Sequence, residues 1–113
     1  MTKEEYKKLL IEMSWRGKFP AVGEKVDGMD AMCMYRTPDG KRCVAGVLIP
    51  DERYTPFLEG KTISSCIVRG AIVMPEGVTT EQLAALQELH DQFSRLPHWP
   101  IHAFNHIVEE ILR

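Results

Sequence analysis

The strongest local signal in this chain is the sequence AMCMYRTPDGKRCVAGVLIP, which occupies residues 31–50. Two runs rich in apolar side chains flank the tetrapeptide Thr37-Pro38-Asp39-Gly40. Proline suits the first position of a turn, aspartate the next, and glycine the left-handed site of a three-residue hairpin loop. The pattern predicts an antiparallel β-hairpin with strands at residues 31–36 and 41–49. The second strand lacks alternation of polar and apolar residues, so we expect both of its faces to be covered.

Three segments outside this stretch show the apolar periodicity of α-helices. Residues 2–5 (TKEE) and 79–82 (TTEQ) are capping boxes, in which a threonine and an acid or amide three residues later each satisfy the other's backbone N–H. The first capping box precedes an apolar stripe over residues 6–13, and the second precedes one over residues 83–96. A third stripe follows Pro100, whose fixed φ suits the first turn of a helix.

The order of these elements predicts an α+β fold. An N-terminal helix and two C-terminal helices are expected to pack on one face of a small sheet formed by the hairpin. Residues 61–74 are compatible either with a strand or with a short helix that Thr62 caps. The chain has 113 residues, of which 44% are hydrophobic and 27% charged, and this is typical of a single domain spanning residues 1–113.

Charge and hydropathy exclude some classes of function. The net charge of −2 and the lack of a basic stripe argue against a nucleic-acid-binding protein. The N-terminal residues lack the apolar core of a signal peptide, and no apolar run approaches the length of a membrane span. Three cysteines without a secretion signal predict reduced thiols. We therefore expect a cytoplasmic protein without a membrane partner.

The hairpin region also carries a motif that resembles known proteins. Cys33-Met34-Tyr35-Arg36 is followed by GKRCVAGVLIPDERY at residues 40–54, by EGK at residues 59–61 and by LQELHD at residues 86–91. This pattern is similar to that of small uncharacterised proteins of tailed bacteriophages and prophages, which carry C-x-Y-R, G-x-K-C-A-V-G-x-L-I-P-D and L-Q-x-x-H-D segments. The order around Cys43 departs slightly from that pattern. The family has no assigned activity, so the resemblance implies a phage origin, a related fold and an accessory role in the cytoplasm of the bacterial host.

Cysteine and histidine side chains are the candidates for chemistry. The expected hairpin pairs Tyr35 with Cys43 and Cys33 with Ala45. The side chains of Cys33 and Cys43 should then lie on one face, with Cβ atoms about 7 Å apart. That separation is too large for an unstrained disulfide, although a shared metal ion could bridge it. His90 falls within the apolar stripe of its helix and is expected to face the interior.

Two kinds of site are compatible with the candidate cluster, which comprises Cys33, Tyr35, Cys43, His90 and Asp91. Adding Cys66 to the two hairpin cysteines and His90 gives a Cys₃His zinc set, although its spacing lacks the C-x₂-C knuckle of zinc fingers. Cys43 as nucleophile, with His90 as base and Asp91 as its orienting group, would make a thiol hydrolase. Against both, free cysteines and lone inward histidines are usually core residues. We therefore expect no cofactor, with zinc as the alternative.

A binding role is the function that the sequence favours over an enzyme. Several large apolar side chains fall near predicted loops and turns, namely Trp15, Phe19, Met32, Met34 and Trp99. Aromatic and methionine side chains are enriched at protein interfaces, but they also fill gaps between packed elements. The sequence predicts a small phage-type accessory protein that acts by protein–protein binding, with a host or phage protein as its partner.

Overall fold

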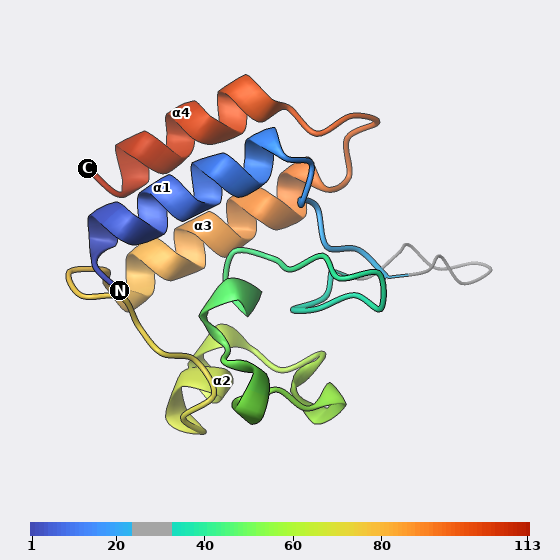
Figure 1. Cartoon of the computed structure of the whole chain (residues 1–113), viewed down its shortest axis with the longest axis vertical. Coiled ribbons are helices and arrows are strands. Elements are labelled where there is room, and N and C mark those ends of the chain that lie inside the picture. The colour runs from blue at the N-terminus through green and yellow to red at the C-terminus, as the bar shows by residue number, and fades with distance from the viewer. Residues whose placement is uncertain (24–32) are drawn as a thin grey trace.

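The computed structural model of this chain describes residues 1–23 and 33–113 (Figure 1). The α-helices in those residues are α1 (Lys3–Trp15), α2 (Ile63–Val68), α3 (Thr80–Phe93) and α4 (Ile101–Ile111). Short 3₁₀ helices at Gly46–Leu48, Asp51–Arg53 and Pro56–Leu58 lie in the segment between α1 and α2. Within the described residues, no helix has both the length and the hydropathy needed to cross a membrane.

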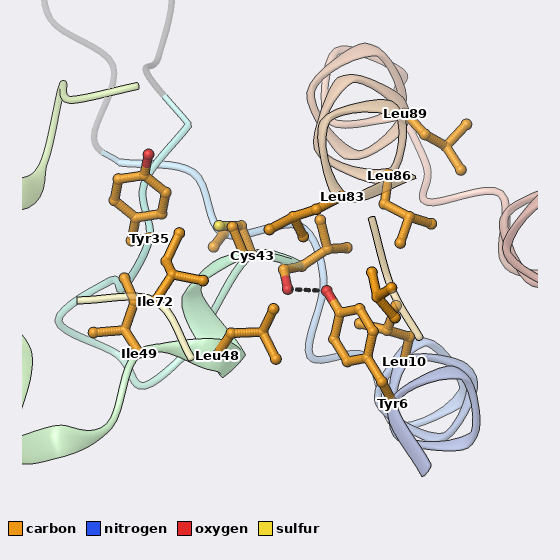
Figure 2. Packing of buried hydrophobic residues seen from close by; sticks show 14 of the residues in the cluster. Tyr6, Leu10, Tyr35, Cys43, Leu48, Ile49, Ile72, Leu83, Leu86 and Leu89 are labelled. Carbon is orange, nitrogen blue, oxygen red and sulfur yellow. Dashed lines mark hydrogen bonds between the residues drawn. The ribbon is translucent and has the colours of Figure 1, made fainter. Parts of the chain in front are cut away.

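The three long helices form one layer, and the irregular middle of the chain lies beside it. Helix α4 packs against both α1 and α3, and the three lie side by side in Figure 1, with residues 33–74 on the side of α3. Figure 2 shows the core where the two parts meet, with Tyr6 from α1, Leu83 from α3 and Leu48 from the irregular segment. The buried hydroxyl of Tyr6 donates a hydrogen bond to the carbonyl of Val44 and so connects α1 with that segment.

Capping boxes start α1 and α3 as the sequence predicts. The Thr2 hydroxyl accepts from the Glu5 N–H at 3.1 Å, and the Glu5 carboxylate accepts from the Thr2 N–H at 3.1 Å. Thr79 and Gln82 form the same reciprocal pair at the start of α3. Thr62 caps α2, so the segment that was compatible with either a strand or a helix contains a short helix.

The predicted hairpin and sheet are wrong, because the described residues contain no β-strand and the fold is helical rather than α+β. The reversal itself is formed: the Thr37 N–H donates to the Lys41 carbonyl at 3.0 Å, and Gly40 has a φ of +89°. A single bridge between Arg36 and Arg42 follows this turn. Backbone pairing between the two segments ends there, whereas in a hairpin it would continue.

Local hydrogen bonds replace the second strand. After Cys43 the chain coils, with the Val47 N–H donating to the Cys43 carbonyl at 3.2 Å and the Gly46 N–H donating to the Cys43 sulfur at 3.2 Å. Gly46 makes this coil possible. A Cβ there would lie 2.0 Å from the Tyr35 carbonyl oxygen, so only glycine lets the coil pack directly on the preceding segment.

On the other side of the turn, the Glu59 carboxylate accepts backbone hydrogen bonds that a neighbouring strand would accept in a sheet. The two oxygens of Glu59 accept the backbone N–H groups of Tyr35 at 2.8 Å and Arg36 at 3.2 Å. The Tyr54 hydroxyl donates to the same carboxylate at 2.7 Å. Because buried backbone donors need a partner, Glu59 allows this segment to be buried without a partner strand.

Candidate functional site

The structure brings Cys33, His90 and Asp91 together, and we call these three residues the His90 cluster. Their sulfur, ring-nitrogen and carboxylate atoms all lie within 4.8 Å of one another. His90 and Asp91 are in the last turn of α3. Cys33 lies in the segment opposite, where it forms an isolated bridge with Val22 rather than the expected pair with Ala45.

His90 uses both ring nitrogens to hold its surroundings, and it faces the interior as expected, with no exposed surface. The Ala21 N–H donates to Nε2 at 3.1 Å, so Nε2 carries no proton. The proton is therefore on Nδ1, which donates to the Asp91 carboxylate at 3.1 Å. The ring also packs against Phe19 and Trp99, with centroid separations of 5.8 and 5.7 Å. His90 thus fixes the segment after α1 onto α3.

Asp91 is half-buried and accepts several hydrogen bonds. The side chains of His90 and Gln87 each donate to its Oδ1 at 3.1 Å. Burial alone raises the pKa of this carboxyl, but the hydrogen bonds that it accepts, that from His90 foremost, outweigh burial and hold the pKa below its ordinary value. Gln87 in turn accepts the Ala45 N–H at 3.2 Å. Through Gln87, the carboxylate is linked to the coil that follows the turn.

Cys33 is held as a thiol. The Ser94 hydroxyl has one proton, and this proton goes to the Asp91 carbonyl at 2.6 Å. The Cys33 sulfur lies 3.2 Å from Ser94 Oγ and is therefore the donor of that contact. Burial raises the pKa of the Cys33 thiol above its ordinary value. A thiol of this kind is a weak nucleophile at neutral pH.

The geometry of the His90 cluster does not fit a zinc ion. His90 would have to bind the metal through Nδ1, the nitrogen beside Asp91, and its remaining proton would then be on Nε2. That N–H would face the Ala21 N–H, leaving two donors 3.1 Å apart. In a metal-bound histidine, the N–H of the second ring nitrogen instead donates to an acceptor. No metal chemistry follows from this cluster.

The same contacts do not make a catalytic triad. In a triad the histidine uses one nitrogen for the nucleophile and the other for the acid. Here Nδ1 of His90 faces Asp91, and Nε2 is occupied by the amide of Ala21. Cys43, the expected nucleophile, is fully buried, and burial raises the pKa of its thiol to about 12.

Tyr35 and Cys66 lie in another part of the core. The Tyr35 hydroxyl donates to the Lys61 carbonyl at 2.6 Å. Burial, together with the neighbouring Cys66 thiol, raises the pKa of Tyr35 well above its ordinary value. Cys66 is buried in α2. In the part of the chain that the structure describes, neither Cys43 nor Cys66 joins the His90 cluster.

The large apolar residues expected at an interface have different environments. Phe19 and Trp99 pack on each other at 5.5 Å between ring centroids and belong to the core or its edge. Trp15 is 56% exposed at the end of α1. Met34 is half-buried and contributes to the groove described next. Met32 lies outside the described residues.

A groove of about 650 Å³ runs along one face of α3. The α3 side and the turn after it contribute residues spaced three and four apart: Ala84, Gln87, Glu88, Asp91, Gln92 and Arg95. The opposite wall consists of residues 33–35 and 59–64. Cys33 and Asp91 are therefore part of the lining, whereas His90 lies behind it.

The sequence did not reveal two residues that shape this groove, Glu59 and Gln87. Both occur in segments of the phage-type pattern, EGK and LQELHD, but neither has a spacing that predicts its partner. Glu59 holds one wall by accepting distant backbone N–H groups. Gln87 connects the other wall to the coil. Their occurrence in those two segments was the only available sign.

Comparisons with protein families, with curated proteins and with solved structures found no match to this chain. The resemblance to small phage proteins therefore stays a prediction. Function has to be argued from the groove, the surface and the hydrogen bonds of the fold.

Proposed function

We propose that this chain is a phage-type accessory protein that acts in the cytoplasm of a bacterial host by binding another protein through the groove along α3. The observation that carries the proposal is the contrast between the His90 cluster and the other α3 residues that line the groove. The polar atoms of the His90 cluster are used in holding the fold. The groove-facing side chains of Ala84, Glu88 and Arg95 are instead exposed and available to a ligand.

The lining favours a protein segment as the ligand. Met34 and Ile63 supply partly buried apolar surface, while Lys61 and Arg95 stand among the carboxylates of the lining. A mixture of apolar contacts and charges of both signs is typical of protein interfaces. The lining carboxylates, including Glu88, would repel the phosphates of a nucleic acid.

The phage-type pattern and the state of the thiols support the biological setting. Glu59 and Gln87, which support the two walls, lie in the segments that resemble those of phage proteins. The three cysteines are free. Free thiols suit a reducing compartment such as the bacterial cytoplasm.

Two neighbouring alanines on α3 provide a matched test. Ala84 and Ala85 are both exposed, but only Ala84 lines the groove. Arginine is a good helix former, so Ala84→Arg and Ala85→Arg should both fold, which thermal melting would verify. Tagged wild-type protein and both variants would capture partners from a bacterial host lysate for quantitative mass spectrometry. The partner's affinity would then be measured by calorimetry with purified components.

We expect a partner that the wild type and Ala85→Arg retain alike and that Ala84→Arg binds at least about tenfold more weakly. Equal binding by the two variants would show that the groove is not the binding surface. An unrelated protein of similar size and charge serves as the control bait. If the wild type captures no protein that this control does not also capture, the binding role is wrong.

A further inference from the structure

A second surface combines an exposed aromatic ring with three cations. Phe57, in the 3₁₀ helix Pro56–Leu58, is 61% exposed. The Lys61 Nζ lies 4.5 Å from the centroid of its ring, and the Arg69 Cζ lies 5.1 Å from it. Arg53 joins Phe57 and Arg69 in lining a hollow of about 410 Å³. We call Arg53, Phe57, Lys61 and Arg69 the Phe57 patch.

Contacts within the chain hold the two arginines in place. Arg53 donates from Nη1 to the Gly70 carbonyl at 2.9 Å, and Arg69 donates from Nε to the Ser65 hydroxyl at 3.1 Å. Each guanidinium has five N–H donors in a planar fork, so most of its donors remain available to a ligand. These arginines are thus oriented before any ligand arrives, which lowers the entropy cost of binding.

The basic side chains of the Phe57 patch form no ion pair in the described part of the chain. Every ion pair found within residues 1–23 and 33–113 involves other basic groups. By contrast, Arg36 and Arg42 both pair with Asp51, at 2.8 and 3.2 Å. A concentration of positive charge on a chain with a net charge of −2 is complementary to a local cluster of negative charge on a ligand.

We propose that the Phe57 patch binds an acidic segment of a protein partner. Carboxylates of that segment would contact Arg53 and Arg69 as forked pairs and Lys61 as a point charge. An apolar side chain beside them would contact the part of the Phe57 ring that Lys61 and Arg69 leave exposed. Arginine and aromatic side chains are also the residues that dominate binding energy at protein interfaces.

The geometry favours an acidic protein segment over a single-stranded nucleic acid. A base binds such proteins by stacking on an aromatic ring, and here Lys61 and Arg69 both lie within cation–π distance of the Phe57 ring. Stacking would require those contacts to be given up. The affinity for a nucleic acid that comes from counterion release grows with the number of phosphates that the protein neutralises. Three cations neutralise few phosphates, so this contribution is small.

The test uses the full chain with two probes: a fluorescein-labelled hexaglutamate peptide, and an oligothymidylate of similar length. Binding would be followed by fluorescence anisotropy at low salt and located by amide chemical shifts. Arg69→Glu reverses one charge in the patch, and Arg53→Gln removes one while keeping a similar shape. Lys8→Glu is the matched control, because Lys8 is exposed on α1 outside the patch and the substitution changes the net charge as Arg69→Glu does.

We expect hexaglutamate to shift amide signals within residues 53–71. Arg69→Glu should weaken its binding at least about tenfold and Arg53→Gln by a smaller factor, while Lys8→Glu has almost no effect. The absence of binding, or equal weakening by Lys8→Glu, would overturn the proposal. Tighter binding of oligothymidylate at the same residues would also overturn it in favour of a nucleic acid.

The outcome of this test is separate from the outcome for the groove. Lys61 lines both surfaces, so they adjoin, but Ala84 is on the α3 side of the groove and not in the Phe57 patch. Ala84→Arg should therefore bind hexaglutamate as the wild type does. If the Phe57 patch does not bind hexaglutamate, the prediction of partner capture through the groove is unaffected. If no partner is captured through the groove, the prediction for hexaglutamate is likewise unaffected.

Discussion

Replacing Gly46 with alanine tests the coil that takes the place of the expected second strand. A Cβ at this position would lie 2.0 Å from the Tyr35 carbonyl oxygen and 2.9 Å from its carbonyl carbon. Both atoms belong to the backbone, so no side-chain rotation relieves the contact. Since ordinary packing tolerates no such overlap, one of the two segments has to move by about 1 Å.

The expected cost follows from what such a movement disturbs. Overpacking a well-packed site costs about 1–3 kcal/mol. The Tyr35 carbonyl also accepts the Cys43 N–H at 3.3 Å, and loss of a hydrogen bond of this kind costs about 1 kcal/mol more. We therefore expect Gly46→Ala to lower the free energy of unfolding by about 3 kcal/mol, from a total of about 5–15 kcal/mol. The melting temperature should fall by about 10–15 °C.

Urea denaturation followed by circular dichroism measures this loss. Gly17→Ala is the control: Gly17 has a φ of +70°, and nothing lies within 4 Å of a Cβ built there. Alanine at that position meets backbone strain only, at a cost of about 1 kcal/mol. If Gly46→Ala is no more destabilising than Gly17→Ala, the close packing of the coil on Tyr35 is refuted.

The hydrogen bonds and the thiols support three more predictions. His90→Leu leaves the Ala21 N–H without an acceptor, so it should lower the free energy of unfolding measured in urea by about 2–4 kcal/mol. His90→Gln should lower it by less, because the glutamine amide oxygen can accept that N–H. Equal losses for the two variants would contradict the assigned hydrogen bond. The pKa of Asp91 is lowered in the folded protein, so its carboxylate stabilises the fold above about pH 4 and this contribution is lost as the pH falls through the folded value. The stability difference between the wild type and Asp91→Asn should therefore narrow from about pH 5 to about pH 3, and a constant difference would count against the assignment. Iodoacetamide at about pH 8 should label Cys33 slowly and leave Cys43 unmodified until the protein unfolds, because burial raises the pKa of Cys43 to about 12; rapid native labelling of Cys43, detected by mass spectrometry, would disprove its burial.

Local structure was predictable where neighbouring residues determine it. The capping box of Thr2 and Glu5 and the left-handed Gly40 depend on contacts within four residues, and both are present. The inward direction of His90 followed from the apolar stripe of its helix, and the residue is fully buried. These features need no knowledge of the tertiary structure.

The hairpin was mispredicted because contacts distant in the sequence decide it. The apolar run after Cys43 suits a buried strand by composition alone. Whether this run forms a strand depends on Gly46 packing against Tyr35 and on Glu59 accepting backbone N–H groups of the opposite segment. Neither interaction has a periodicity that a sequence pattern shows.

The candidate site was predictable only in part for the same reason. Cys33 and His90 were expected to lie near each other through a sheet, and they do meet, but on a segment that pairs with Val22 instead. The groove depends on how residues 59–64 lie against α3, and no local signal reports that arrangement. Asp91 accepts the Nδ1 proton of His90 directly, although adjacent residues on a helix project about 100° apart.

The protonation of His90 tests most directly the central claim that the hydrogen bonds of the His90 cluster hold the fold. Long-range proton–nitrogen NMR of the full chain reports which ring nitrogen carries the proton. Recording it before and after addition of equimolar zinc shows whether a metal changes that state. We expect the proton on Nδ1, an unprotonated Nε2 bonded to the Ala21 amide, and no change with zinc. A proton on Nε2, or a shift of the His90 signals with zinc, would contradict the claim.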